Sequence, residues 1–198
     1  MRVLETSPRR MGDEYQDRMA SLTEYLATDY DEWADPDRLD LDLQNLDLPD
    51  DSLDVVLTSH VLEHVPDTGR ALSELHRVIA PGGVAYVMVP LTAARTAPPA
   101  APEFHNDETP VFWRFGWDFA DVVAAAGFTV STLVTADLLS RAQHANGWGY
   151  VGPDVDSGSV LDGARQRADS LTVVGDVATS RWFGFDPSFF FVAWECRR

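Results

Sequence analysis

The sequence predicts an α/β fold with a mostly parallel central sheet and an antiparallel last strand. Short apolar runs alternate with segments of helical periodicity along most of the chain. The runs 54–59 (DVVLTS) and 84–89 (VAYVMV) are largely apolar, as is typical of parallel strands buried on both faces. Parallel neighbours require crossover connections, which helices supply. The 198 residues contain no internal repeat or linker, so a single domain over 1–198 is expected.

The first half of the chain is expected to supply five strands between Arg2 and Val89, four of which have a clear sequence pattern. Residues 11–22 have larger apolar side chains at helical spacing on one side. Residues 68–80 have an apolar helical stripe, and Pro81-Gly82-Gly83 is expected to end that helix. In order, the sequence indicates a strand at 2–5, a helix at 11–22, a strand at 24–28, a strand at 54–59, a helix at 68–80 and a strand at 84–89.

The second half is less regular. A stretch rich in Pro and Ala at 92–102 is expected to form a mobile loop over the functional site. A helix at 117–126 and a strand at 128–134 follow. The region 136–180 has weak periodicity and clusters of Gly and Asp, which favour a lid or an insertion. A last strand is expected at 189–194.

Composition limits the function classes. The formal net charge is −17 and the chain has no lysine, so its field repels phosphate and argues against nucleic-acid and anionic-membrane partners. No apolar run has membrane-spanning length and no signal-peptide pattern follows Met1, so a cytoplasmic protein is expected. Cys196 is the only cysteine, which excludes an intramolecular disulfide and a cysteine zinc cluster.

One short motif suggests a metalloprotease. His60 to His64 reads H-x-x-E-H, the inverted zinc-protease pattern. Such a site needs both histidines on one face of a helix and a third protein ligand. Here the histidines follow directly on a strand, Pro66 comes two residues after His64, and no Glu occurs between Glu108 and Glu195. The sequence therefore predicts no metal site.

A longer block supports a different interpretation. Residues 42–46 fit an Asp-x-x-x-Leu loop, 54–64 fit D-x-V-x-x-x-x-V-L-E-H, and 77–83 fit R-V-L-x-P-G-G with Ile for Leu. Together they resemble the class I S-adenosylmethionine-dependent methyltransferases, in the small-molecule methyltransferase-domain branch, over about residues 2–128. The resemblance implies a Rossmann-like, doubly wound sheet, S-adenosylmethionine as cofactor, and methyl transfer to oxygen or nitrogen of a small molecule.

The resemblance also implies a cofactor site at the carboxyl ends of the strands, where ligands bind in open parallel sheets. Asp29 would hold the ribose hydroxyls, since ionised acceptors make the stronger hydrogen bonds. Tyr30 would lie against the adenine, and Asp42 would accept from the adenine amino group beside the Leu43 backbone. The remaining cofactor residues would be Glu5, Thr6 and Ser7 after the first strand, and Ser59 and His60 along the methionine portion.

Two departures from the family pattern are evident. The family has an E-x-G-x-G turn after the first strand, but this chain has Ser7 and Arg9 at the glycine positions, so the glycine loop is degenerate. The family has a helical segment before the first strand, whereas here the strand begins at Arg2. A minimal form, an upstream start, and cover supplied by a homodimer partner or another chain all remain open. The alternative function is a binding or regulatory subunit, or a non-methylating enzyme on the same scaffold.

Two histidines are candidate catalytic residues. His64 would act as a general base, because an imidazole titrates near neutral pH, or it would brace the loop together with Glu63. His105 with Asp107 or Glu108 would form an acid–base pair or a weak metal site, or belong to a solvated acidic loop. Trp113 would form the wall of a substrate pocket and Arg114 would clamp a substrate carboxylate, with core packing as the alternative.

Overall fold

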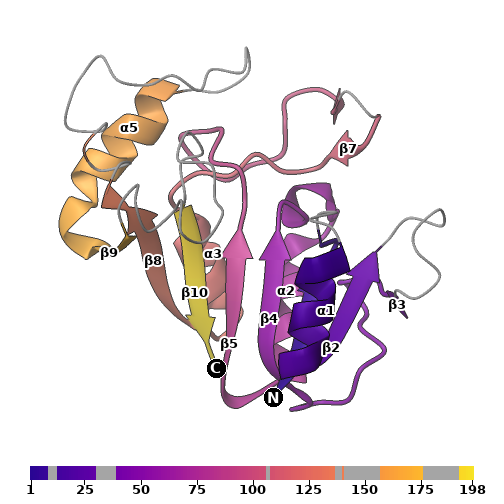
Figure 1. The fold of residues 1–198 in the computed structure, drawn as a ribbon. Coiled ribbons are helices and arrows are strands. Elements are labelled where there is room, and N and C mark those ends of the chain that lie inside the picture. The colour runs from indigo at the N-terminus through magenta and orange to yellow at the C-terminus, as the bar shows by residue number, and fades with distance from the viewer. Residues whose placement is uncertain (9–12, 30–38, 106–107, 137–139, 141–156, 176–191) are drawn as a thin grey trace.

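The computed structural model describes residues 1–8, 13–29, 39–105, 108–136, 140, 157–175 and 192–198. Eight strands form one sheet in the order β3-β2-β1-β4-β5-β10-β8-β9. In this described sheet only β10 (Val192–Arg197) runs antiparallel, against β5 and β8. Figure 1 shows α1 in front of the sheet and α2 and α3 behind it, so helices cover both faces. The predicted α/β, doubly wound, mostly parallel fold with an antiparallel last strand is confirmed.

The five strands expected between Arg2 and Val89 are present. They pair in parallel, with β1 in the middle between β2 and β4. Successive side chains of a strand point to opposite faces of the sheet, and helices cover each face. Leu4 joins the core beneath α2, while Glu5 faces α1 and accepts a hydrogen bond from Tyr15. The strands are β1 (Arg2–Thr6), β2 (Glu24–Asp29), β3 (Leu39–Asp40), β4 (Leu53–Ser59) and β5 (Ile79–Met88).

Helices connect these strands. Helix α1 (Asp13–Leu22) links β1 to β2, and α2 (Thr68–Val78) links β4 to β5. The Asp67 side chain caps α2 by accepting from the Arg70 backbone N–H at 2.9 Å. The buried apolar stripe of α2 packs on the sheet and consists of Ala71, Leu72, Leu75 and Val78.

The prediction that Pro81-Gly82-Gly83 ends this helix is wrong. Helix α2 ends at Val78 because Ile79 is already extended and pairs with Leu53 of β4. The Pro-Gly-Gly segment instead lies inside β5, where the register with β4 shifts and the strand bulges. Gly82 has a φ of 85°, and a Cβ on Gly83 would lie 2.9 Å from the carbonyl oxygens of Ala80 and Asp54. The glycines serve a strand bulge rather than a helix stop.

The second half completes the sheet. Helix α3 (Phe119–Ala125) and β8 (Thr129–Thr135) lie close to their predicted positions. The last strand begins at Val192, and residues 189–191 lie outside the described residues. Within the predicted lid or insertion at 136–180, the described residues form α5 (Ser157–Gln166), the short turn η2 (Ala168–Ser170) and β9 (Leu171–Gly175), which pairs in parallel with β8. A lid role for this region remains a prediction.

Aromatic side chains fix β10 in the sheet. Phe115, Phe119 and Trp194 are fully buried, with ring centroids 4.8 Å and 5.0 Å apart in edge-to-face contacts. The small pair β6 (Glu103–Phe104) and β7 (Pro110–Val111) stands apart from the sheet, above the end of β4 in Figure 1. Among the described helices, none is long and apolar enough to cross a membrane.

Candidate functional site

The sheet register brings the predicted cofactor residues to one edge. Thr6 of β1 pairs with Thr28 of β2 on one side and with Thr58 of β4 on the other. The segment Glu5–Ser7, the backbone of Asp29 and the pair Ser59-His60 therefore all lie at neighbouring carboxyl ends. Tyr30 lies outside the described residues. Strand ends in this arrangement form the usual ligand crevice of an open parallel sheet.

Glu5 is already engaged within the protein. Its Oε2 accepts hydrogen bonds from the Tyr15 hydroxyl at 2.9 Å and the Tyr25 hydroxyl at 2.7 Å. Burial and the neighbouring Glu5 charge raise the pKa of Tyr15 to about 12, so this phenol stays a hydrogen-bond donor over the physiological range. The two tyrosines hold the Glu5 carboxylate in one position against α1. No pattern in the sequence indicates that Tyr15 and Tyr25 contact Glu5.

The turn after β1 has a left-handed backbone conformation at a residue that is not glycine. Ser7 has a φ of 46°, in the left-handed region, and its backbone N–H donates to the Thr28 carbonyl at 2.6 Å. Glycine adopts this conformation freely, whereas Ser7 carries a Cβ, so the turn holds strain at this residue.

Replacing Ser7 by glycine is expected to stabilise the protein by about 0.5–1 kcal/mol. Relief of left-handed strain is worth about 1–2 kcal/mol and outweighs the roughly 0.5–1 kcal/mol that glycine loses to chain entropy. Urea unfolding measures the change. The Ser7→Ala variant keeps a Cβ and serves as the control, for which no gain is expected. Equal stability of the two variants would contradict strain at this position.

The loop that carries Asp42 and Leu43 is internally ordered. Asp42 Oδ1 accepts from the Gln44 backbone N–H at 2.8 Å and from Gln44 Nε2 at 3.2 Å, which closes an Asx turn. Leu43 and Leu46 are buried beneath the loop. Gln44 Nε2 also lies 3.5 Å from Oδ2, so both oxygens of the Asp42 carboxylate contact Gln44, while the side chain as a whole remains exposed.

Helix α2 holds this loop through charged side chains. Arg70 Nε donates to the Gln44 carbonyl at 2.6 Å, and Glu74 Oε2 accepts from the Leu46 backbone N–H at 3.0 Å. Arg77 donates to the carbonyl oxygens of Leu46 and Leu48, both at 2.8 Å, and to the Glu74 carboxylate at 2.7 and 2.9 Å. The arginine of the R-V-L-x-P-G-G block therefore positions the loop at 42–48, a role that its place on a helix did not indicate.

Histidines gather where β4 ends. His60 has a φ of 56° and follows Ser59 directly, and the single turn η1 (Leu62–His64) comes next. The two histidines of the H-x-x-E-H pattern therefore do not share a helix face. No group of His, Cys, Asp or Glu in the described parts of the chain has an arrangement suited to a metal ion.

The predicted catalytic residues His64 and His105 are brought together. Their rings are 4.8 Å apart in an edge-to-face contact. His64 Nδ1 lies 2.7 Å from the Pro110 carbonyl, and Glu63 Oε1 lies 3.6 Å from His60 Nδ1 and 3.9 Å from His64 Nε2. The Glu63 side chain is only 1% exposed. A buried carboxylate between two imidazoles is a chemically competent proton-transfer group.

Trp113 and Arg114 already have partners within the protein. Trp113 Nε1 donates to the Pro66 carbonyl at 3.0 Å, and Arg114 Nε donates to Glu103 Oε2 at 2.7 Å. The Ala97 and Arg114 backbones exchange two hydrogen bonds, which tie the predicted mobile loop to the chain before α3. Trp113 also packs against the core, as the predicted alternative of core packing has it. Substrate contact by Trp113 and Arg114 remains a prediction.

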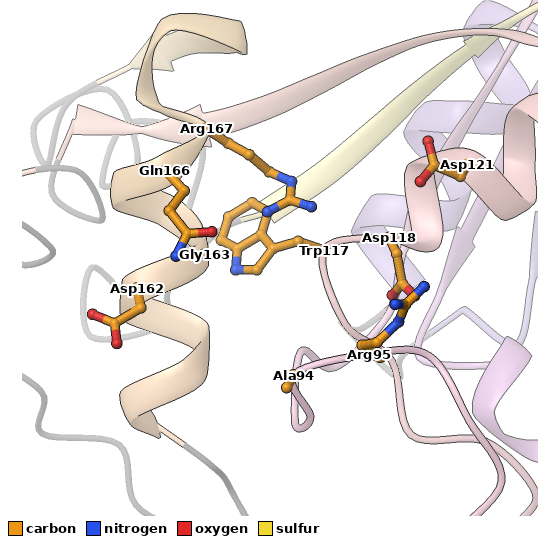
Figure 2. A pocket seen from close by; sticks show the side chains of 9 residues that line it. All are labelled: Ala94, Arg95, Trp117, Asp118, Asp121, Asp162, Gly163, Gln166 and Arg167. Atoms are coloured by element: carbon orange, nitrogen blue, oxygen red, sulfur yellow. The ribbon is translucent and has the colours of Figure 1, made fainter.

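A polar hollow of about 430 Å³ lies apart from the predicted residues, between the turn at Ala94-Arg95, the start of α3 and helix α5. Figure 2 shows the Trp117 indole between α5 and the Arg95 turn. Arg95 Nε lies 3.4 Å from Asp118 Oδ2, and Trp117 Nε1 donates to the Val160 carbonyl. Its lining residues are Ala94, Arg95, Trp117, Asp118, Asp121, Asp162, Gly163, Gln166 and Arg167.

Helix α5 depends on Gly163 for its contact with Trp117. A Cβ at Gly163 would lie 2.2 Å from Trp117 Cδ1, and the indole is buried and bonded to Val160, so it has little room to move. Gly163→Ala is expected to detach α5 and raise amide hydrogen exchange there at least tenfold. Gly158→Ala makes the same substitution at an exposed position of α5 and is the control for altered helix propensity. Equal exchange in both variants would show that the close contact is unimportant.

Comparison with known proteins agrees with this geometry. Residues 13–87 match the family model described as a methyltransferase domain. A Mycolicibacterium smegmatis protein described as a probable S-adenosylmethionine-dependent methyltransferase is 48% identical over 48 residues, which is 24% of this chain and 19% of that protein. The match thus spans about a fifth of the relative's length.

Solved structures share the fold at low identity. A methyltransferase from Archaeoglobus fulgidus aligns over 99% of this chain and 86% of its own, with a TM-score of 0.54 and 13% identity. One from Mesorhizobium loti aligns over 99% and 90%, with a TM-score of 0.51 and 16% identity. The fold likeness extends over the whole chain, and the family match adds the sequence signature within it. Residues 13–87 are therefore similar in sequence to a methyltransferase domain, and the fold is that of the two solved S-adenosylmethionine-dependent methyltransferases.

Proposed function

We propose that the protein transfers a methyl group from S-adenosylmethionine to an oxygen or nitrogen atom of a small molecule. The observation that carries the proposal is the family match over residues 13–87, within a sheet whose register sets Glu5–Ser7, Asp29 and Ser59-His60 at one edge. This combination supports the methyl-transfer activity, because a shared fold alone does not determine chemistry, whereas the oxygen or nitrogen acceptor is what the sequence resemblance implies.

The residues at this edge suit the cofactor. Asp29 and Asp42 offer carboxylates for the ribose diol and the adenine amino group, with Leu43 beside Asp42 and Tyr30 next in sequence to Asp29. The Thr6 and Thr58 hydroxyls are buried and have no hydrogen-bond partner among the described residues. Buried hydroxyls without partners favour the arrival of a polar ligand or water at this edge.

The chemistry supplied by bound S-adenosylmethionine is a methyl group activated by a sulfonium. The protein would align the acceptor in line with that methyl carbon and exclude water, which can contribute several kcal/mol to lowering the barrier. A hydroxyl or ammonium acceptor must also lose a proton. The imidazoles of His60, His64 and His105 lie close enough together for one of them to receive it.

Replacing Asp29 or Asp42 by alanine is expected to weaken S-adenosylmethionine binding roughly ten- to a hundredfold, Asp29 the more strongly. A hydrogen bond to an ionised acceptor contributes about 1.5–3 kcal/mol. Titration calorimetry with the cofactor and with S-adenosylhomocysteine measures the loss. Asp47→Ala removes an exposed carboxylate from the same loop and should bind like the parent. Parent-like affinity of both test variants would refute the cofactor assignment.

A second candidate function is a binding or regulatory subunit of the same fold. The strained Ser7 turn and the engagement of Glu5 by two tyrosines favour it, because both replace features of the family turn. A Haloferax volcanii protein with a TM-score of 0.52 and 14% identity was solved with a Trm112 methyltransferase activator. A partner chain or a second copy over the cofactor edge is proposed on the same basis. Binding of S-adenosylmethionine without methyl transfer to any acceptor tested would favour this alternative.

A further inference from the structure

The Glu63 carboxylate organises the histidine cluster from beneath. It is the one buried acidic side chain in the part of the chain that the structure describes. Its Oε2 has no hydrogen-bond partner there, and its Oε1 faces His60 and His64. An ionised carboxylate removed from water without a donor is costly, so nearby N–H groups are drawn to it. The two imidazoles are its nearest recorded partners.

His64 is held in the protein through Nδ1, while its Nε2 lies beyond hydrogen-bond length of the nearby carboxylate. Its Nδ1 lies 2.7 Å from the Pro110 carbonyl oxygen, which accepts only, so Nδ1 carries a hydrogen. Its Nε2 faces the buried Glu63 at 3.9 Å. The side chain is 21% exposed and also packs against the His105 ring. The His64 ring is therefore the more buried of the two imidazoles and is held against Pro110.

His60 has the opposite arrangement. Its Nδ1 lies 3.6 Å from Glu63 Oε1, just beyond hydrogen-bond length, and no partner of its Nε2 is recorded among the described residues. The side chain is 40% exposed. Its backbone is held in the left-handed region while its N–H donates to the Met88 carbonyl at 3.0 Å. Strain of this kind at a residue with a bulky side chain is typical of functional sites.

We propose that His60, rather than His64, is the general base of the methyl transfer, and that Glu63 is its positioning residue. A carboxylate at one imidazole nitrogen fixes the tautomer and leaves the other nitrogen as the proton acceptor. The inference rests on the proposed function and assigns His60 a catalytic role in addition to its predicted place beside the methionine portion.

In the proposed step, methyl transfer and proton transfer are coupled. The acceptor oxygen or nitrogen bonds to the methyl carbon while its proton passes to His60 Nε2. The carbon–sulfur bond breaks and its electron pair stays on sulfur, which gives S-adenosylhomocysteine and the methylated product. The His60 imidazolium is stabilised by Glu63 through Nδ1–H and then releases its proton to solvent. His64 keeps the turn η1 in place through Pro110.

Nitrogen-15 NMR of the imidazoles tests the arrangement in the ligand-free protein at about pH 8.5, where ordinary imidazoles are neutral. His60 and His64 are both expected as the Nδ1–H tautomer. In Glu63→Leu, His60 should change to a mixture of tautomers, while His64 keeps Nδ1–H because of Pro110. Glu63→Gln is the isosteric second variant if the leucine variant does not fold. An Nε2–H tautomer of His60 in the parent protein overturns the proposal.

Titration with S-adenosylhomocysteine then locates the base. The ring signals of His60 are expected to shift on binding, whereas those of His64 and of the internal control His76, on helix α2 against Phe128, should not. Shifts at His64 with none at His60 overturn the assignment of His60 alone. Absence of calorimetric binding overturns the proposed function and with it the base role, and the tautomer result still reports separately on the His60–Glu63 pair.

Discussion

Replacing Arg77 by methionine is expected to destabilise the protein by about 2–4 kcal/mol and to weaken cofactor binding as well. The guanidinium donates to the Leu46 and Leu48 carbonyls and to Glu74, so its loss leaves three acceptors without their donor. The loop at 42–48 then loses its attachment to α2, and Asp42 moves with it. Urea unfolding and calorimetry with S-adenosylhomocysteine measure the two effects separately.

The contacts of Arg77 contribute unequally to the stability of the protein. Asp50 lies 2.6 Å from the guanidinium but is 72% exposed, so this ion pair contributes little. The matched control Asp50→Asn is therefore expected to change stability by less than about 0.5 kcal/mol. Arg77→Lys should lose most of what Arg77→Met loses, because one ammonium cannot reach two carbonyls and a carboxylate in the fork geometry of a guanidinium. A lysine variant with parent stability would contradict the proposed attachment of the loop.

Lowering the pH should reduce the difference in unfolding free energy between the parent protein and Arg77→Met. The hydrogen bond from Arg77 is the largest cause that lowers the pKa of Glu74. A carboxyl group with a lowered pKa stabilises the fold above its ordinary value of about 4.3, and that stabilisation is lost as the pH falls through the lowered pKa. Arg77→Met lacks the effect, so the two unfolding free energies should approach each other below about pH 4.

Much of the fold could be predicted because parallel strands and the crossover helix have local signatures. The apolar runs that became β4 and β5 are long, and α2 has an apolar stripe with Asp67 as its cap. Strand β3 has only two residues and no apolar run, so it exists through its pairing with β2. The Pro-Gly-Gly segment was assigned to the wrong role, because both a helix stop and a strand bulge require a positive φ.

The candidate site was predictable in place but not in its contacts. Strand ends are visible in the sequence, so the positions of Ser7 and His60 followed from the pattern. The burial of Glu63 depends on the chain at 110–113, whose backbone N–H groups at Phe112 and Trp113 donate to the Glu63 carbonyl. That contact joins segments about fifty residues apart, and no local pattern indicates it. For this reason the sequence pointed to His64 as the base and placed His60 only beside the cofactor.

His60→Asn is expected to lower kcat by about 10²–10⁴-fold, the usual contribution of a general base, and to weaken S-adenosylhomocysteine binding by a far smaller factor. Asparagine tolerates the left-handed backbone at position 60, so the variant should fold like the parent. The loss should be largest near neutral pH and shrink in alkali, where a hydroxyl acceptor ionises without help. Turnover against pH, on an acceptor found by screening small phenols, carboxylic acids and amines, measures the effect.

His64→Asn is the matched variant and separates the two histidines. It removes the contacts with Pro110 and Glu63, so it should lower the melting temperature and reduce kcat by a similar, small factor at every pH. The reverse pattern, with a neutral-pH loss in His64→Asn and parent-like turnover in His60→Asn, would return the base role to His64 as the sequence predicted. Glu63→Asp shortens the side chain by one methylene. Its kcat should lie between that of Glu63→Gln and that of the parent, because a charge held slightly too far from His60 Nδ1 still favours the imidazolium over the neutral ring.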